Sequence, residues 1–403
     1  MRIKGGTAGY TLVELLVVML IFAVVMSVIS VTFARIVQSS GQLMKSGETD
    51  TGGLIGLELM RSDLELAGFG LPWSAPGVVY SEANDNLSLV QNCPCPEAKA
   101  SLFDDRAYDS DNNIPRAYRV GNNVGYNGSD YLVLKGSALG TGRVSRTWGY
   151  LNYSSTVALQ YPGGDDDLRF KKGDRAIVVK TGIAGGLPVR ELVTEGNTFN
   201  IVYGYPFPEK FLPRDKGDSY LVYGVATEDS SSLRFPFNRA DYYISRPEPK
   251  KMSFSCAQGT GVLYKSNITQ GGGHVGYPIL DCAADLQVVF FWDTNGDREI
   301  DYHSGTGDEL LEEVVSTPSE LRDKLKEVRV YILAQQGKRD PRYSYPLAST
   351  DAAIVVGDAA LSRADGEVLG RVWKASALET AFGADWRNYH WKLYTIVVQP
   401  KNL

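Results

Sequence analysis

The longest apolar stretch of the chain lies near its N-terminus, where residues 15–34 contain no charged side chain. Leu, Val, Ile, Met, Phe and Ala fill most of these positions. As a helix that rises about 1.5 Å per residue, such a stretch spans roughly 30 Å, the thickness of a bilayer's hydrocarbon core. The pattern predicts a membrane-spanning helix over residues 11–34.

A second helical pattern follows a polar stretch that contains several glycines. Leu57, Met60 and Leu64 are spaced three and four residues apart and have charged residues between them. This spacing predicts an amphipathic helix over residues 54–67 that packs against a sheet. Gly68 and Pro72 then end the helix, and the two helical parts together form an N-terminal helical region over residues 10–70.

From residue 71 onward, short runs of β-branched and aromatic residues alternate with loops. These runs predict strands over residues 131–134, 175–179, 201–203, 220–223, 241–244, 286–292, 328–333 and 391–398. Short helices are expected over residues 318–326 and 375–382, and residues 81–130 are interpreted as loops. The predicted fold class is α+β: a long N-terminal hydrophobic helix packed on a β-rich, loop-rich C-terminal head of residues 71–403.

Composition narrows the range of functions. The formal net charge of the 403 residues is −6, without a long block of one sign, which argues against nucleic acid as a partner. The chain has three histidines and no nucleophile, phosphate-loop or zinc-protease motif. We therefore expect a protein that is not an enzyme.

Four cysteines suggest disulfide bonds in an exported domain. Cys256 and Cys282 bracket a glycine-rich loop, so we expect these two to form one bridge. Cys93 and Cys95 are separated by a single proline, an awkward spacing for a local bridge, and the sequence leaves their pairing open.

Three interpretations compete for the N-terminal segment. A cleaved secretory signal requires a shorter apolar run and a better cleavage site than this chain offers. A plain signal anchor, with Arg2 and Lys4 in the cytoplasm, fits the charges but does not explain Glu14 at the start of the apolar run. A carboxylate inside a membrane helix costs a few kcal/mol and usually has a function or a partner.

Residues 9–18, Gly-Tyr-Thr-Leu-Val-Glu-Leu-Leu-Val-Val, resemble the class III signal of type IV pilins and pseudopilins. The resemblance implies a leader of residues 1–9, cleavage by prepilin peptidase between Gly9 and Tyr10, and N-methylation of Tyr10. That family usually has Phe where this chain has Tyr10. Cleavage would create a cation at Tyr10, and its pairing with Glu14 would set the axial register of the subunit in a filament.

An acidic loop follows the predicted strand of residues 286–292 directly. Its oxygen-bearing residues occupy alternate positions, as Ca²⁺ requires in a tight loop: Asp293, Asn295, Asp297, Glu299 and Asp301. The spacing resembles the first nine positions of an EF-hand loop but has Ser304 where that loop needs a bidentate Glu. The alternative is a hairpin turn, because Asn-Gly is a strong turn signal. Calcium binding at this loop is a prediction.

Several further segments are similar to minor pilins of the PilW type: residues 59–70, 280–288, 326–337 and 388–403. The resemblance implies a subunit that primes type IV pilus assembly and is incorporated at or near the pilus tip through its N-terminal helix. Its expected partners are prepilin peptidase, other minor and major pilins, and the inner-membrane pilus assembly machinery. It would be a single-pass inner-membrane protein with a periplasmic C-terminal domain, and would later be part of the pilus.

Two alternatives stay open. One is a minor pseudopilin of a type II secretion system, which the neighbouring genes would distinguish. The other is a membrane-anchored adhesive or ligand-binding module that uses the loops of residues 81–250 as its surface.

Overall fold

The computed structural model of this chain divides into two compact units, Met1–Asp50 and Thr51–Leu403. The structure describes residues 53–105, 114–153, 159–163, 166–184, 186–227, 233–253, 255–304, 318–362 and 368–403. Six isolated positions in the first unit are also described. The predicted leader and most of the predicted membrane segment lie outside the described residues.

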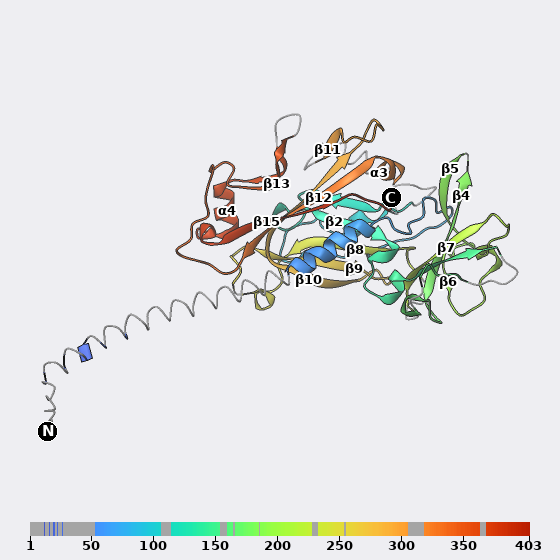
Figure 1. The fold of residues 1–403 in the computed structure, drawn as a ribbon, viewed down its shortest axis with the longest axis horizontal. Helices are drawn as coiled ribbons and strands as arrows, with labels where there is room; N and C mark the ends of the chain where they lie inside the picture. Colours follow the sequence, from blue (N-terminus) through green and yellow to red (C-terminus); the bar gives the residue numbers. More distant parts are fainter. Residues whose placement is uncertain are drawn as a thin grey trace, which may run out of the picture. The chain divides into compact units, whose positions relative to one another are not determined.

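Most of the regular secondary structure described in the second unit is antiparallel β-sheet (Figure 1). The strands are β1 Tyr118–Gly121, β2 Tyr131–Gly136, β3 Trp148–Asn152, β4 Arg175–Ala184, β5 Leu187–Leu192, β6 Ile201–Val202, β7 Ser219–Ala226, β8 Asn238–Ser245, β9 Gly261–Ile268, β10 His274–Trp292, β11 Tyr302–Ser304, β12 Leu325–Gln336, β13 Ile354–Ser362, β14 Val368–Trp373 and β15 His390–Val398. The α-helices are residues 53–66, α3 Pro318–Lys324 and α4 Ala375–Phe382.

The described strands form three sheets. The largest has eight strands in the order β1-β2-β8-β9-β10-β12-β15, with β11 paired to β10. A five-stranded sheet has the order β3-β7-β4-β5, with β6 paired to β4. Strands β13 and β14 form a separate two-stranded sheet.

The second half of strand β10 is buried on both faces of the largest sheet. Leu286, Val288 and Phe290 belong to the main core, whereas Val289 and Phe291 belong to a second core with β13, β14 and α4. Burial on both faces explains why this stretch is a continuous apolar run rather than an alternating one.

Strand β10 pairs with two neighbouring strands, and its register shifts between the two pairings. Its first half pairs with β9 and its second half with β12, and the register shifts between Leu280 and Ala283. Cys282 sits in this shift with a φ of 53°, a left-handed conformation typical of a bulge. The disulfide from Cys282 to Cys256 fixes the bulge to the segment before β9.

The helix of residues 53–66 packs against the main core. It buries Leu57, Met60 and Leu64, the three residues that predicted an amphipathic helix. The helix comes very close to β10, since a Cβ added to Gly56 would lie 2.2 Å from the carbonyl oxygen of Ile279. Only glycine fits at this contact.

The predicted fold class is wrong for the part of the chain that the structure describes. The regular secondary structure of that part is mostly β-sheet with short helices, rather than an α+β fold led by a long hydrophobic helix. Within the described ranges, no helix is long and apolar enough to cross a membrane. The helical content of the prediction came chiefly from residues 10–52, whereas from residue 71 onward period-two and continuously apolar runs dominate and form strands.

Candidate functional site

The residues predicted for processing and assembly, Gly9, Tyr10 and Glu14, lie outside the described residues. The described positions around them are all apolar, helical and exposed: Leu12, Leu16, Met19, Leu20, Phe22 and Met26. Their exposed fractions range from 48% at Met26 to 78% at Leu12. Large apolar side chains at this exposure are available for contact with lipid or with other subunits.

A buried ion pair attaches the helix of residues 53–66 to the largest sheet. One carboxylate oxygen of Asp63 accepts hydrogen bonds from the Tyr242 hydroxyl at 2.6 Å and the Lys265 ammonium at 2.5 Å. Asp63 is 4% exposed and Lys265 is 2% exposed. Burial raises the pKa of Asp63, and the Lys265 charge acts in the opposite direction. Tyr242 and Lys265 come from β8 and β9, so these contacts fix the helix on two strands at once.

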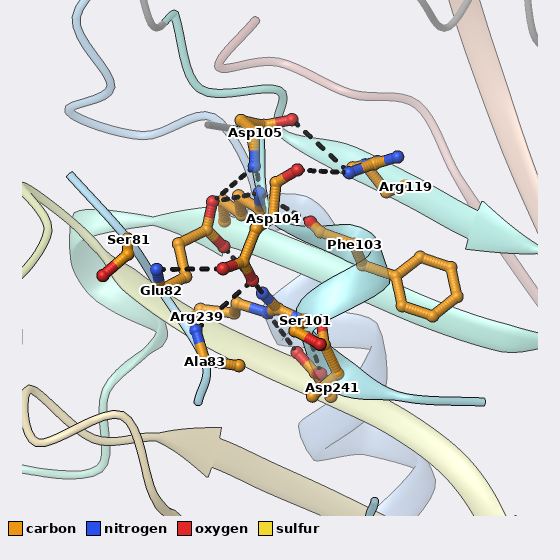
Figure 2. Close-up of polar contacts among 12 residues, drawn as sticks. Ser81, Glu82, Ala83, Ser101, Phe103, Asp104, Asp105, Arg119, Arg239 and Asp241 are labelled. Atoms are coloured by element: carbon orange, nitrogen blue, oxygen red, sulfur yellow. Dashed lines mark hydrogen bonds and ion pairs between the residues drawn. The ribbon is translucent and has the colours of Figure 1, made fainter. Parts of the chain in front are cut away.

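A larger charged network lies inside the same core (Figure 2). Arg239 on β8 is its centre: the guanidinium contacts Glu82 at 2.7 Å, Asp104 at 2.8 Å and Asp241 at 2.7 Å. It also donates to the Ala100 carbonyl at 2.7 Å. All of these side chains are almost completely buried.

Lys135 on β2 extends the network. Its ammonium lies 2.7 Å from Glu82 and 2.5 Å from Asp105, and it donates to the Phe103 carbonyl at 3.1 Å. Asp105 also accepts hydrogen bonds from the backbone and guanidinium of Arg116. The network therefore attaches the connecting segment of residues 82–105 to β2 and β8.

Opposite charges offset the effect of burial on the pKa of two members of this network, Asp105 and Arg239. Burial alone would raise the pKa of Asp105, but Lys135, Arg116 and their neighbours lower it to about 2. Burial acts to lower the pKa of Arg239, yet Asp241 and Glu82 raise it well above the usual value. These short ion pairs hold residues 82–105 on the sheet. We therefore interpret the network as structural.

Sequence reasoning missed this network. It placed Asp104 and Asp105 in the loops of residues 81–130 and did not predict that both are buried. The sequence did place a charged residue at each of two predicted strands. Lys135 directly follows the apolar run Tyr131–Leu134, and Arg239 precedes a run of strand-forming residues on β8. Such a charge is buried only with a partner, but the sequence does not say which acidic residue supplies it.

All four cysteines form disulfide bonds. Cys256 is bonded to Cys282, the pairing favoured from the sequence. Cys93 is bonded to Cys95, the pairing that the sequence left open.

The acidic loop between β10 and β11 is a compact turn stabilised by its own carboxylates. The Asp293 carboxylate accepts backbone N–H bonds from Gly296 and Arg298, at 2.6 Å and 2.9 Å. Asp301 accepts from the backbone of Thr294 at 2.8 Å. Burial acts to raise the pKa of Asp293, but these backbone donors and Lys326 keep it below its usual value.

The predicted calcium ligands do not converge in this arrangement. Asp297 accepts from the backbone of Glu299, and Asn295 accepts from the backbone of Asp297, so each side chain is directed to its own turn. Across the described ranges, no group of three or more His, Cys, Asp or Glu side chains gathers as metal ligands. The geometry is that of the hydrogen-bonded turn that the sequence offered as the alternative, and calcium binding stays a prediction.

We test that prediction by differential scanning calorimetry of the full-length protein in detergent, with calcium and with a chelator. Because each carboxylate oxygen has a second lone pair, bound Ca²⁺ would stabilise the fold by about 2.7 kcal/mol at roughly 100 times its Kd. The variant Asp297→Ala should lose that gain, whereas Asp167→Ala, in an exposed acidic turn elsewhere, should keep it. An unchanged melting temperature and no heat of binding in titration would contradict the prediction that this loop binds calcium.

Comparison with known proteins gives one match. Residues 5–30 match the prokaryotic N-terminal methylation motif, a segment that contains Gly9, Tyr10 and Glu14. No curated protein and no solved structure matches the chain. The motif supports a type IV pilin-like or pseudopilin protein, and it suggests processing by prepilin peptidase, a membrane anchor and assembly with pilins.

Proposed function

We propose that the protein is a minor pilin of the PilW type that primes type IV pilus assembly and is incorporated at or near the pilus tip through its N-terminal segment. The match of residues 5–30 to the N-terminal methylation motif carries this proposal. In this proposal, prepilin peptidase cuts between Gly9 and Tyr10, the new terminus is methylated, and Glu14 pairs with an N-terminal amine during assembly.

The properties of the described residues support a role in binding. The six exposed apolar side chains from Leu12 to Met26 would be costly in water and favourable in a membrane or a filament core. The compact second unit, Thr51–Leu403, contains the head and has two disulfides and a buried charged network, as suits a domain that works outside the cytoplasm. The proposed partners are other minor and major pilins and the inner-membrane assembly machinery.

Mass spectrometry of the mature N-terminus tests the proposal. We expect the protein extracted from membranes to begin at Tyr10 and to carry one added methyl group on its terminal nitrogen. In a matched variant, Gly9→Val should block cleavage and leave residues 1–9 in place, because a branched side chain replaces the glycine at the cut bond. Recovery of the wild-type chain with its leader intact would overturn the proposal.

A deletion strain then separates the pilus from a secretion system. Loss of surface pili with normal protein secretion is the expected result for a minor pilin. Normal pili with defective secretion would instead identify a minor pseudopilin of a type II secretion system, which the same motif equally allows.

A further inference from the structure

The described part of the head contains a groove at the junction of its two larger sheets. Its walls come from the segment between β2 and β3, the end of β7, the start of β8, and the hairpin formed by β9 and β10. Its volume is about 590 Å³. Grooves of this size accommodate a small ligand or a few units of a larger one.

The chemistry of the described lining favours an uncharged ligand. None of the sixteen described residues that line the groove is charged, although 22% of the chain is Asp, Glu, Lys or Arg. Among the described residues of the lining, none offers a counter-charge to an ion that loses water in this groove. The lining therefore selects an uncharged ligand.

The same lining suits a ligand rich in hydroxyl groups. Thr141, Asn238 and Tyr277 contribute hydroxyls and an amide, and the Thr141 and Tyr277 hydroxyls lie 3.4 Å apart. Gly271 has no side chain to cover its backbone groups. Hydroxyl groups both donate and accept, so they can pair with this mixed set.

One wall also offers an apolar surface. Val275 and Tyr277 are two positions apart on β10, so their side chains share a face of the strand. They are 46% and 38% exposed. A tyrosine ring with an adjacent valine provides a flat apolar patch with a polar tip, which matches the C–H face and hydroxyl rim of a pyranose.

The walls are held in place without a ligand. The amide nitrogen of Asn267 donates to the Leu139 carbonyl at 3.0 Å, and that of Asn238 donates to the Ser137 carbonyl at 2.6 Å. The Ser145 hydroxyl lies 2.7 Å from the Gly140 carbonyl oxygen, which closes the loop at the rim. A preformed site loses little entropy when it binds.

We propose that this groove binds a neutral oligosaccharide, with a pyranose ring stacked on Tyr277. The proposed binding does not involve the N-terminal segment, so it can be tested separately from the proposed role in pilus assembly. It would give the head a ligand of its own at the cell surface.

Isothermal titration calorimetry of the full-length protein in detergent tests this with maltotetraose, cellotetraose and chitotetraose as neutral probes. Tetragalacturonate serves as the charged probe. We expect at least one neutral probe to bind with Kd below about 5 mM, and tetragalacturonate to bind at least tenfold more weakly. Binding of tetragalacturonate with equal affinity, or no neutral binding at about 5 mM, would overturn the proposal.

Blocking variants locate the site. A Cβ added to Gly142, in the groove, or to Gly217, outside it, would contact nothing within 4 Å, so neither position requires glycine for space. Gly142→Trp should fill the groove and abolish binding, whereas Gly217→Trp should bind like the wild type. Neutral-probe binding that survives in Gly142→Trp would place the ligand elsewhere and overturn the proposal.

Ring variants test the stacking contact. Tyr277→Ala should weaken binding at least tenfold and Tyr277→Phe should retain most of it, because the ring rather than the hydroxyl carries the contact. Tyr205→Ala, at a tyrosine that is 52% exposed and outside the groove, should leave the affinity unchanged. Equal affinities of Tyr277→Ala and wild type would contradict the proposal, as would tight binding of an uncharged Gly-Ser peptide in place of the sugars.

Discussion

The Glu14→Val variant is expected to insert into the inner membrane normally and to be absent from purified pili. Valine is favourable in hydrocarbon, whereas a carboxylate there costs a few kcal/mol unless it is paired. Membrane insertion therefore does not need Glu14. We expect assembly to need Glu14, because in the proposed mechanism its carboxylate pairs with the N-terminal amine that cleavage creates at Tyr10.

The measurement is the ratio of subunit in sheared pili to subunit in the membrane fraction, by immunoblot. Glu14→Gln should fail like Glu14→Val, since it keeps the length of the side chain but loses the charge. Glu58→Val is the matched control, because the Glu58 side chain is 75% exposed on the helix of residues 53–66. If Glu14→Val entered pili at the wild-type ratio, the pairing would have no role in assembly.

Strands with a local signature could be predicted from the sequence. The run Leu286–Trp292 is apolar without interruption and forms the doubly covered half of β10. The helix over Ala375–Phe382 was predicted at the residues where α4 is observed. In these segments the local preference and the tertiary environment agree.

Other elements could not be predicted, because their stability comes from distant partners. The first half of β10 includes Gly276 and Pro278, both poor strand formers, and is held by pairing with β9. Strands β13 and β14 cover a face of the largest sheet that only the folded chain creates. The long N-terminal helix illustrates the opposite case: a strong local pattern led to a fold class that the described part of the chain contradicts.

The candidate sites divide in the same way. The processing and assembly motif is contiguous in sequence, so Gly9, Tyr10 and Glu14 could be identified from their order, and a family profile matches the same segment. The charged network and the groove are assembled from segments more than one hundred residues apart. No spacing rule connects Glu82 to Arg239, and only the folded sheet brings them together.

The second large effect is expected from that network. We predict that Arg239→Met lowers the free energy of unfolding by about 3–5 kcal/mol. The substitution leaves Glu82, Asp104 and Asp241 buried without their shared cation. The contacts with Arg239 then no longer offset the cost of removing these carboxylates from water. Methionine has nearly the volume of arginine's aliphatic part, so the loss comes from charge more than from a cavity. Urea unfolding curves of wild type and variant give the difference.

Two matched variants separate the effect of burial from that of losing an ion pair. Arg339→Met breaks an exposed pair with Asp385, in which the side chains are 47% and 54% exposed, and should change the free energy of unfolding by less than about 1 kcal/mol. The double variant Arg239→Met/Asp241→Asn should be more stable than Arg239→Met alone, because it removes one of the stranded charges while Tyr131 can still donate to the amide oxygen. An Arg239→Met effect as small as that of Arg339→Met would show that water reaches the network and that its charges do not hold residues 82–105 on the sheet.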